Sequence, residues 1–225
     1  LILAYLLQKF VFEKAGKQTF FVVMGLLLAL YSFKTISRNF VWESDYKLFT
    51  TDVETSTNSA KVLNAAGGAL TAEAFKEKDE SKKREMLTKA IGYLNKAVTV
   101  HPTYKNAYLI MGNAYYYLNE YEKSVTAYGK ALEIDGDFKD AFNNQAVALR
   151  DAGKYAGEKE NDLQKAESYL KRAYQMVPTD LETVRLLGVT NGVKGNHSEA
   201  IKFFAIVAEG QPNSAIAFLN LSNAY

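Results

Sequence analysis

The chain has 225 residues, of which 27 are basic and 25 acidic, giving a formal net charge of +2. This near balance predicts no basic surface of the kind that binds nucleic acid. No cysteine is present, which excludes disulfides, thiol catalysis and cysteine-ligated zinc. His101 and His197 lie too far apart to suggest a shared metal, and no cofactor is expected.

The first 37 residues are apolar enough to predict a membrane region. Leu1 to Leu7 reads as the end of one helix, and Gln8 to Gln18 as a short basic loop. Thr19 to Phe33 then has 15 residues without a charge. Extended to Ser37, this stretch nearly reaches the ~20 residues that span a bilayer. We therefore expect residues 19–37 to cross the lipid bilayer.

Three alternatives fit this stretch less well. A signal peptide ends at a small-residue cleavage site, which is missing here. A buried soluble helix would show a polar stripe, and an interfacial helix would show a charged face. The lysines of the short loop favour the cytoplasm for that loop, so the rest of the chain is expected on the exoplasmic side, in a periplasm or an endoplasmic reticulum lumen.

Residues 38–59 are predicted to be an interfacial connector. The spacing of its apolar residues indicates a short amphipathic helix near the lipid headgroups, and Asp52 is expected to lead into a turn. The apolar residues are Phe40, Trp42, Tyr46, Leu48, Phe49 and Val53.

Lys105 to Phe138 is a 34-residue segment that organises the remainder. Gly112, Ser124 and Ala131 are small residues placed where two antiparallel helices approach closely. Asn119 and Glu120 form the turn between these helices. The bulky residues at the seams are Tyr108, Met111, Tyr115, Tyr121, Tyr128 and Leu132. The pattern resembles the tetratricopeptide repeat, a helix-turn-helix unit of 34 residues that buries its apolar face only by stacking on neighbours.

Further copies follow the same phase. Residues 60–225 are expected to form the repeats 60–104, 105–138, 139–180 and 181–214 and a partial repeat 215–225. The copy at 139–180 has eight extra residues, assigned to its inter-helix turn around AGEKENDL, and the excess in 60–104 falls in the charged run FKEKDESKKRE. Pro102, Gly136, Pro178 and Pro212 stand where the second helices should stop. The fold predicted is all-α: a transmembrane helix followed by a right-handed tetratricopeptide-repeat solenoid, rather than a generic helical bundle.

Stacked repeats offer a concave surface built by their first helices, where a protein or an extended peptide is the expected partner. The exposed positions expected there are Asn106, Leu109, Asn113, Tyr116, Tyr117, Asp140, Asn143, Arg150, Asp151, Glu182, Arg185 and Val189. Tyr116 and Tyr117 present rigid amphipathic rings suited to peptide binding. Either ring could instead pack against the neighbouring repeat, and the sequence leaves both readings open.

The junction between membrane helix and repeats carries a more specific resemblance. Its residues are Arg38-Asn39, Trp42, Asp45, Leu48-Phe49, Asp52-Val53 and the run from Ser59 to Val62 that leads into Gly67. They are similar to the corresponding segment of the membrane-embedded protein O-mannosyltransferases with C-terminal tetratricopeptide repeats. That resemblance implies a multi-spanning enzyme with a polyprenyl-linked sugar donor and exoplasmic repeats. Asn58 departs from the family, which usually has a proline at that position.

No residue is assigned a catalytic role, because the resemblance places the acidic catalytic residues in an early loop outside this sequence. No phosphate-binding loop, GxSxG, HExxH or EF-hand spacing occurs. Asp135, Asp137 and Asp140 lack the spacing of a calcium loop and are expected to cap helices. Two functions remain: the C-terminal part of a membrane glycosyltransferase that positions protein acceptors, or a non-catalytic scaffold that assembles a cell-envelope complex.

Overall fold

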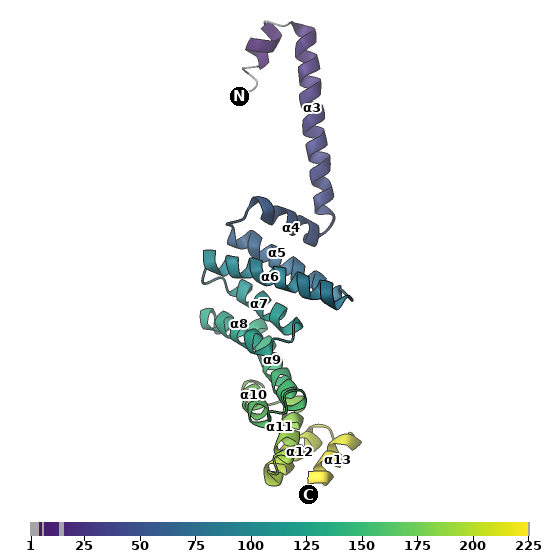
Figure 1. The fold of residues 1–225 in the computed structure, drawn as a ribbon, viewed down its shortest axis with the longest axis vertical. Coiled ribbons are helices and arrows are strands. Elements are labelled where there is room, and N and C mark those ends of the chain that lie inside the picture. Colours follow the sequence, from purple (N-terminus) through teal and green to yellow (C-terminus); the bar gives the residue numbers. More distant parts are fainter. Residues whose placement is uncertain (1–4, 6, 14–15, 225) are drawn as a thin grey trace. The chain divides into compact units, whose positions relative to one another are not determined.

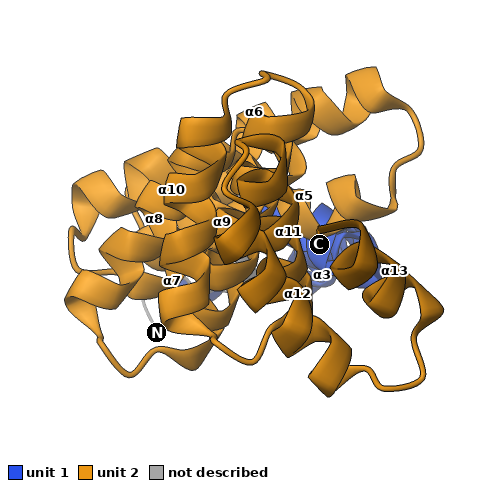
Figure 2. Cartoon of the chain, turned by 90° about the horizontal axis from the view of Figure 1, so that it is seen from below, with its two compact units in different colours: residues 1–52 blue, residues 53–225 orange. Residues whose placement is uncertain are grey.

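The computed structural model describes residues 5, 7–13 and 16–224, and all elements within these ranges are helical (Figure 1). The chain divides into two compact units, residues 1–52 and 53–225 (Figure 2).

The first unit is dominated by one long apolar helix, α3 (Lys17–Asn39). Its 23 residues extend about 35 Å at ~1.5 Å per residue, more than the ~30 Å of a bilayer's hydrocarbon. None of its residues is buried. Among the described residues, Lys17–Glu43 is the one helical stretch long and apolar enough to cross a membrane, judged by length and composition. The predicted span 19–37 lies inside α3.

The chain before α3 differs from the prediction. The π-helical turn η1 (Leu7–Phe12) covers residues from Gln8 onward that were expected in a loop, and α3 begins at Lys17 within the same predicted loop. Gly16, at φ 88°, separates the two helices in a conformation that favours glycine. The predicted helix end Leu1–Leu7 falls for the most part outside the described residues.

The connector is helical for most of its length. The 3₁₀ helix η2 (Phe40–Glu43) leads to α4 (Asp45–Thr55). The expected turn lies within the polar run, at residues 56–59, and so begins after Asp52. Asp52 lies within α4, where its carboxylate forms an ion pair with Arg38 at the end of α3.

The second unit consists of helix pairs in chain order (Figure 1). The pairs are α5 (Ala60–Lys76) with α6 (Glu80–Val100), α7 (Lys105–Tyr117) with α8 (Tyr121–Ile134), α9 (Lys139–Glu158) with α10 (Leu163–Met176), and α11 (Leu181–Val193) with α12 (His197–Gly210), followed by α13 (Ala215–Ala224). Each helix packs on its neighbours in sequence, and α5, α7, α9 and α11 also contact one another in that order. The second helices end just before Pro102, Gly136, Pro178 and Pro212, as expected.

A glycine in each first helix permits close packing of the pair. A Cβ at Gly67, Gly112, Gly153 or Gly188 would lie 2.4–2.7 Å from Leu94, Tyr128, Leu170 or Phe204, respectively. In the second pair, the Ser124 hydroxyl also donates to the Gly112 carbonyl oxygen at 2.9 Å. The close approach of α7 and α8 at Gly112 and Ser124 is therefore as predicted.

The extra residues of the third pair were assigned to the wrong place. They lengthen α9, which remains helical through Glu158, and the turn to α10 has only four residues, 159–162. In this pair the glycine at the close approach is Gly153, which packs against Leu170. The 34-residue period counted from Gly112 would instead place it at position 146, which is an alanine. Ala152 and Ala156 are buried beside it, so an apolar stripe continues along the added turns.

The excess of the first pair is also mainly helical. Its charged run continues α5 to Lys76 and starts α6 at Glu80, with Asp79 accepting hydrogen bonds from the backbone N–H of Ser81 and Lys82. An N-cap aspartate satisfies amides that have no partner within the helix, so α6 can begin inside the charged run.

Candidate functional site

The first-helix face is the surface formed by the predicted positions on α7, α9 and α11. The structure separates these positions into side chains that tie helices together and side chains that remain exposed.

Asn113 ties three helices together. Its Oδ1 accepts hydrogen bonds from the Tyr128 hydroxyl at 2.6 Å and from Asn144 Nδ2 at 3.0 Å. Burial raises the pKa of Tyr128, which favours the neutral hydroxyl as donor. Asn113 therefore links α7 to α8 and α9. Asn144 was not predicted; its signal was a polar residue about one repeat after Asn113 on the next first helix.

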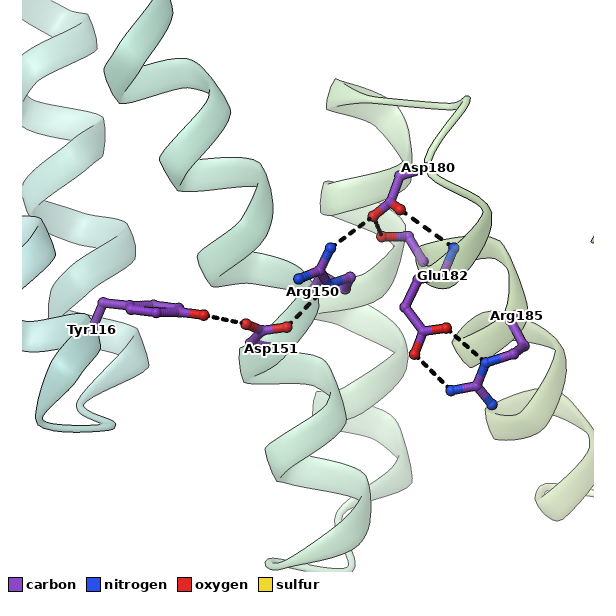
Figure 3. Close-up of polar contacts among 7 residues, drawn as sticks. Tyr116, Arg150, Asp151, Asp180, Glu182 and Arg185 are labelled. Carbon is purple, nitrogen blue, oxygen red and sulfur yellow. Dashed lines mark hydrogen bonds and ion pairs between the residues drawn. The ribbon is translucent and has the colours of Figure 1, made fainter.

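Tyr116 begins a polar chain across α7, α9 and the start of α11 (Figure 3). Its hydroxyl donates to Asp151, which also pairs with Arg150 Nε at 3.0 Å. Arg150 Nη1 reaches Asp180 at 3.4 Å. Partial burial and then the hydrogen bond to Asp151 raise the pKa of Tyr116 above its ordinary value. The chain joins three successive first helices through side chains.

Asp180 continues the network as the N-cap of α11. Its carboxylate accepts from the Glu182 backbone N–H at 3.3 Å and from the Thr183 hydroxyl at 2.6 Å. Glu182 in turn holds Arg185 in a bidentate pair at 2.8 and 2.7 Å (Figure 3). The hydrogen bond from Arg185 lowers the pKa of Glu182, so its carboxylate is ionised at neutral pH.

Leu109 and Tyr117 are packing residues. Leu109 lies against the core cluster around Val125, Tyr128 and Leu149. The Tyr117 ring lies 5.3 Å from that of Phe75 on α5 and 5.9 Å from that of Tyr116. Both tyrosines are thus engaged by neighbouring helices.

The remaining predicted positions are exposed. Asn106 lies on α7, Asp140 and Asn143 on the first two turns of α9, and Val189 on α11. They are the part of the predicted set that stays accessible to a partner.

The aspartates around the second inter-repeat turn do not form a metal site. Asp135 forms an ion pair with Lys105 and accepts the backbone N–H of Asp137 at 3.1 Å. Within the described ranges, no group of three or more histidine, cysteine, aspartate or glutamate residues could hold a metal ion.

Paired helices that stack through their first members define an α-helical repeat protein. A family model described as a TPR repeat matches residues 112–153. The second unit is accordingly a tetratricopeptide-repeat solenoid. Two solved structures share this fold: YrrB, described as a TPR protein with an unusual peptide-binding site (24% identity, TM-score 0.50, 79% of this chain and 81% of that chain), and MamA (18% identity, TM-score 0.52, 81% and 88%).

Curated relatives match part of the chain. Protein O-mannosyl-transferase TMTC3 of Homo sapiens is 27% identical over 134 residues, which are 60% of this chain and 13% of that protein. Protein O-mannosyl-transferase Tmtc3 of Drosophila melanogaster is 29% identical over 111 residues, 49% of this chain and 11% of that protein. Anaphase-promoting complex subunit 3 of Schizosaccharomyces pombe is 22% identical over 130 residues, 58% and 18%. The chain therefore spans less than a fifth of the length of each of these relatives.

Proposed function

We propose that this chain is a membrane-anchored tetratricopeptide-repeat module whose first-helix face binds an extended segment of another protein. The observation that carries the proposal is that this face combines side chains that fix neighbouring helices with side chains that remain exposed. Asn113, Tyr116 and Asp151 fix the successive first helices α7 and α9, while Asp140 and Asn143 stay exposed on α9. An amide side chain can donate to and accept from an extended backbone, and a rigid support lowers the entropic cost of binding.

We further propose that the module belongs to a polyprenyl-sugar-dependent membrane glycosyltransferase, in which it positions protein acceptors on the exoplasmic side. The junction from Arg38 to Gly67 and the partial similarity to relatives named O-mannosyl-transferase support this context. α3 serves as the anchor, with residues 19–37 in the bilayer. The described residues contribute binding and placement to this activity; no catalytic side chain among them is assigned.

A non-catalytic scaffold is the second candidate. The similarity to a subunit of the anaphase-promoting complex covers almost as much of the chain as the similarity to the human transferase, 58% against 60%. In this function the same face would hold a subunit of a cell-envelope complex.

The peptide-binding proposal is tested with the full chain in lipid nanodiscs, by selecting ligands from a displayed library of random linear peptides. Selected peptides should lose affinity for Asn143→Arg, which places a bulky charge on the exposed face of α9. Thr126→Arg is the matched control, because Thr126 is exposed on the second helix α8. Equal binding to both variants, with unchanged helicity by circular dichroism, would place the peptide elsewhere.

Membrane side and enzymatic context need separate measurements. In sealed oriented vesicles, protease should digest the repeats only from the exoplasmic face; digestion only from the cytoplasmic face contradicts the transferase context. Membranes from cells expressing the gene should transfer labelled mannose from a polyprenyl-phosphate donor to peptides, and less so with Asn143→Arg. Peptide binding without any transfer favours the scaffold.

A further inference from the structure

The lengthening of α9 creates a corner in the second unit, away from the exposed positions of the first-helix face. Asp151 contacts Tyr116, the next-to-last residue of α7, yet α9 continues for seven more residues, from Ala152 to Glu158. At ~1.5 Å per residue this carries α9 about 10 Å beyond the end of α7. After a short turn, α10 packs back along the extension, with Leu170 over Gly153.

This extension forms one side of an open pocket beside the α7–α8 turn. The pocket has a volume of about 320 Å³ and lies between Asn119 and Glu120 of the turn, the first residues of α8, the extension of α9 and the start of α10. That volume is at the lower end of small-ligand sites, which begin at ~300 Å³. We call it the corner pocket.

Three tyrosines give the corner pocket aromatic walls: Tyr121 from α8, Tyr155 from α9 and Tyr169 from α10. The rings of Tyr121 and Tyr155 are 5.7 Å apart and tilted by 57°. The ring of Tyr116 packs edge-on against that of Tyr121, with the two ring centroids 5.7 Å apart. Ala152 also lines the pocket, and its small side chain leaves space between the rings.

The charged side chains of the corner pocket are paired with one another. Lys165 Nζ lies 2.8 Å from Glu122 and 2.9 Å from Glu160, and Lys123 lies 2.7 Å from Glu120. A charged ligand must compete with one of these internal partners. A neutral hydroxyl can instead donate to a carboxylate and accept from the Lys165 ammonium while the ion pairs remain, and hydrogen bonds to ionised groups are the stronger kind.

Aromatic faces and fixed charged partners together suit a ligand with apolar C–H faces and several hydroxyl groups. The negative face of a tyrosine ring attracts weakly positive C–H groups. We propose that the corner pocket binds a neutral hexopyranose residue, with its C–H face on Tyr155 and its hydroxyls at Lys165 and Glu160. This site does not rest on peptide binding at the first-helix face.

Saturation-transfer NMR of the full chain in lipid nanodiscs tests the proposal, with methyl α-D-mannopyranoside and methyl α-D-glucopyranoside as probes. At least one hexoside should receive saturation at its ring protons. Tyr155→Ala and Lys165→Met should each abolish the signal. Tyr93→Ala and Lys171→Met are the controls, because Tyr93 lies on α6 and the exposed Lys171 pairs with Glu167, and none of these three residues lines the corner pocket.

Further arms separate the possible outcomes. A threonine peptide carrying one α-mannose, compared with the bare peptide, shows whether a protein-linked sugar is held as well as a free one. N-acetylargininamide is the cationic probe, and the proposal is overturned if it binds and neither hexoside does. The proposal is also overturned if the hexoside signals of wild type and Tyr155→Ala are equal. Asn143→Arg should leave hexoside binding intact, so failure of the peptide site does not affect this result. Tyr155 is 40% exposed, so its truncation leaves the core in place.

Discussion

Tyr128 lies so close to Gly112 that a Cβ at position 112 would be 2.4 Å from the tyrosine's Cε1 atom. The same ring is 2% exposed and its hydroxyl reaches Asn113. One contact thus sets both the separation of α7 from α8 and the position of a side chain that holds α9.

Gly112→Ala should destabilise the second unit by about 1–3 kcal/mol, because the buried ring must move and the hydrogen bond to Asn113 is disturbed. Thermal and urea unfolding followed by circular dichroism measures the change. Gly92→Ala is the matched control: a Cβ there meets no atom within 4 Å, and alanine is favoured over glycine in a helix by up to ~1 kcal/mol. Equal melting temperatures for the two variants would contradict the packing of α7 on α8.

Tyr116→Phe should cost about 0.5–1 kcal/mol at neutral pH, because Asp151 loses one hydrogen bond at a partly exposed site. The raised pKa of Tyr116 also predicts a pH dependence. Its stabilisation is complete below the ordinary tyrosine pKa near ~10 and is lost as pH rises through the higher folded pKa. Stability of the wild type should therefore fall more steeply above about pH 10 than that of Tyr116→Phe. Urea midpoints between neutral and alkaline pH measure this, and parallel curves would exclude the Tyr116–Asp151 contact.

Asp180→Ala should lower stability by about 0.5–2 kcal/mol, because α11 loses its N-cap and Arg150 loses a carboxylate. Urea denaturation provides the measurement. Asp137→Ala, an exposed aspartate in the preceding inter-repeat turn, is the control and should stay within ~0.5 kcal/mol of wild type. A smaller loss at Asp180 than at Asp137 would show that the cap is dispensable.

Trp42 should report on the membrane interface. It is the one tryptophan of the chain and is 66% exposed, next to Phe40 at 67%. Aromatic rings of this kind gather at lipid headgroups. In reconstituted vesicles its fluorescence should be blue-shifted and quenched more by lipids brominated near the headgroup than by aqueous iodide. Trp42→Tyr gives the background, and efficient iodide quenching would place the connector in water.

Some of these features follow from residue spacing and others do not. The 34-residue phase of Lys105 to Phe138 predicts the α7–α8 pair and its close approach at Gly112. A glycine at that position leaves room for a bulky side chain on the second helix. The same spacing misplaces the insertion of the third pair. Ala152 to Glu158 contains no proline that would end a helix, but it includes Gly153 and Gly157, which are poor helix formers. A length difference alone therefore does not show whether a turn or a helix absorbs it.

The helices that carry the candidate positions were predicted, but the contacts of their side chains were not. Asn113 and Tyr116 lie on the expected helix, but they form hydrogen bonds with Asn144 and Asp151 of α9. These partners come about one repeat later, at 31 and 35 residues, so polar pairs at this separation are the signal to look for. Which members of such a set pair, and which stay exposed, depends on helix crossing geometry that one chain's spacing does not encode.

The unequal lengths of α9 and its neighbours also bear on how the array assembles. Arrays of near-identical units can dock a helix onto the wrong neighbour while folding. α9 is 20 residues long, whereas α7 and α11 have 13 each. Its added turns carry the glycine and the alanines against which α10 packs, and α7 and α11 have no such added turns. A swapped partner would leave part of that apolar stripe in water, and this cost favours the pairing of α10 with α9.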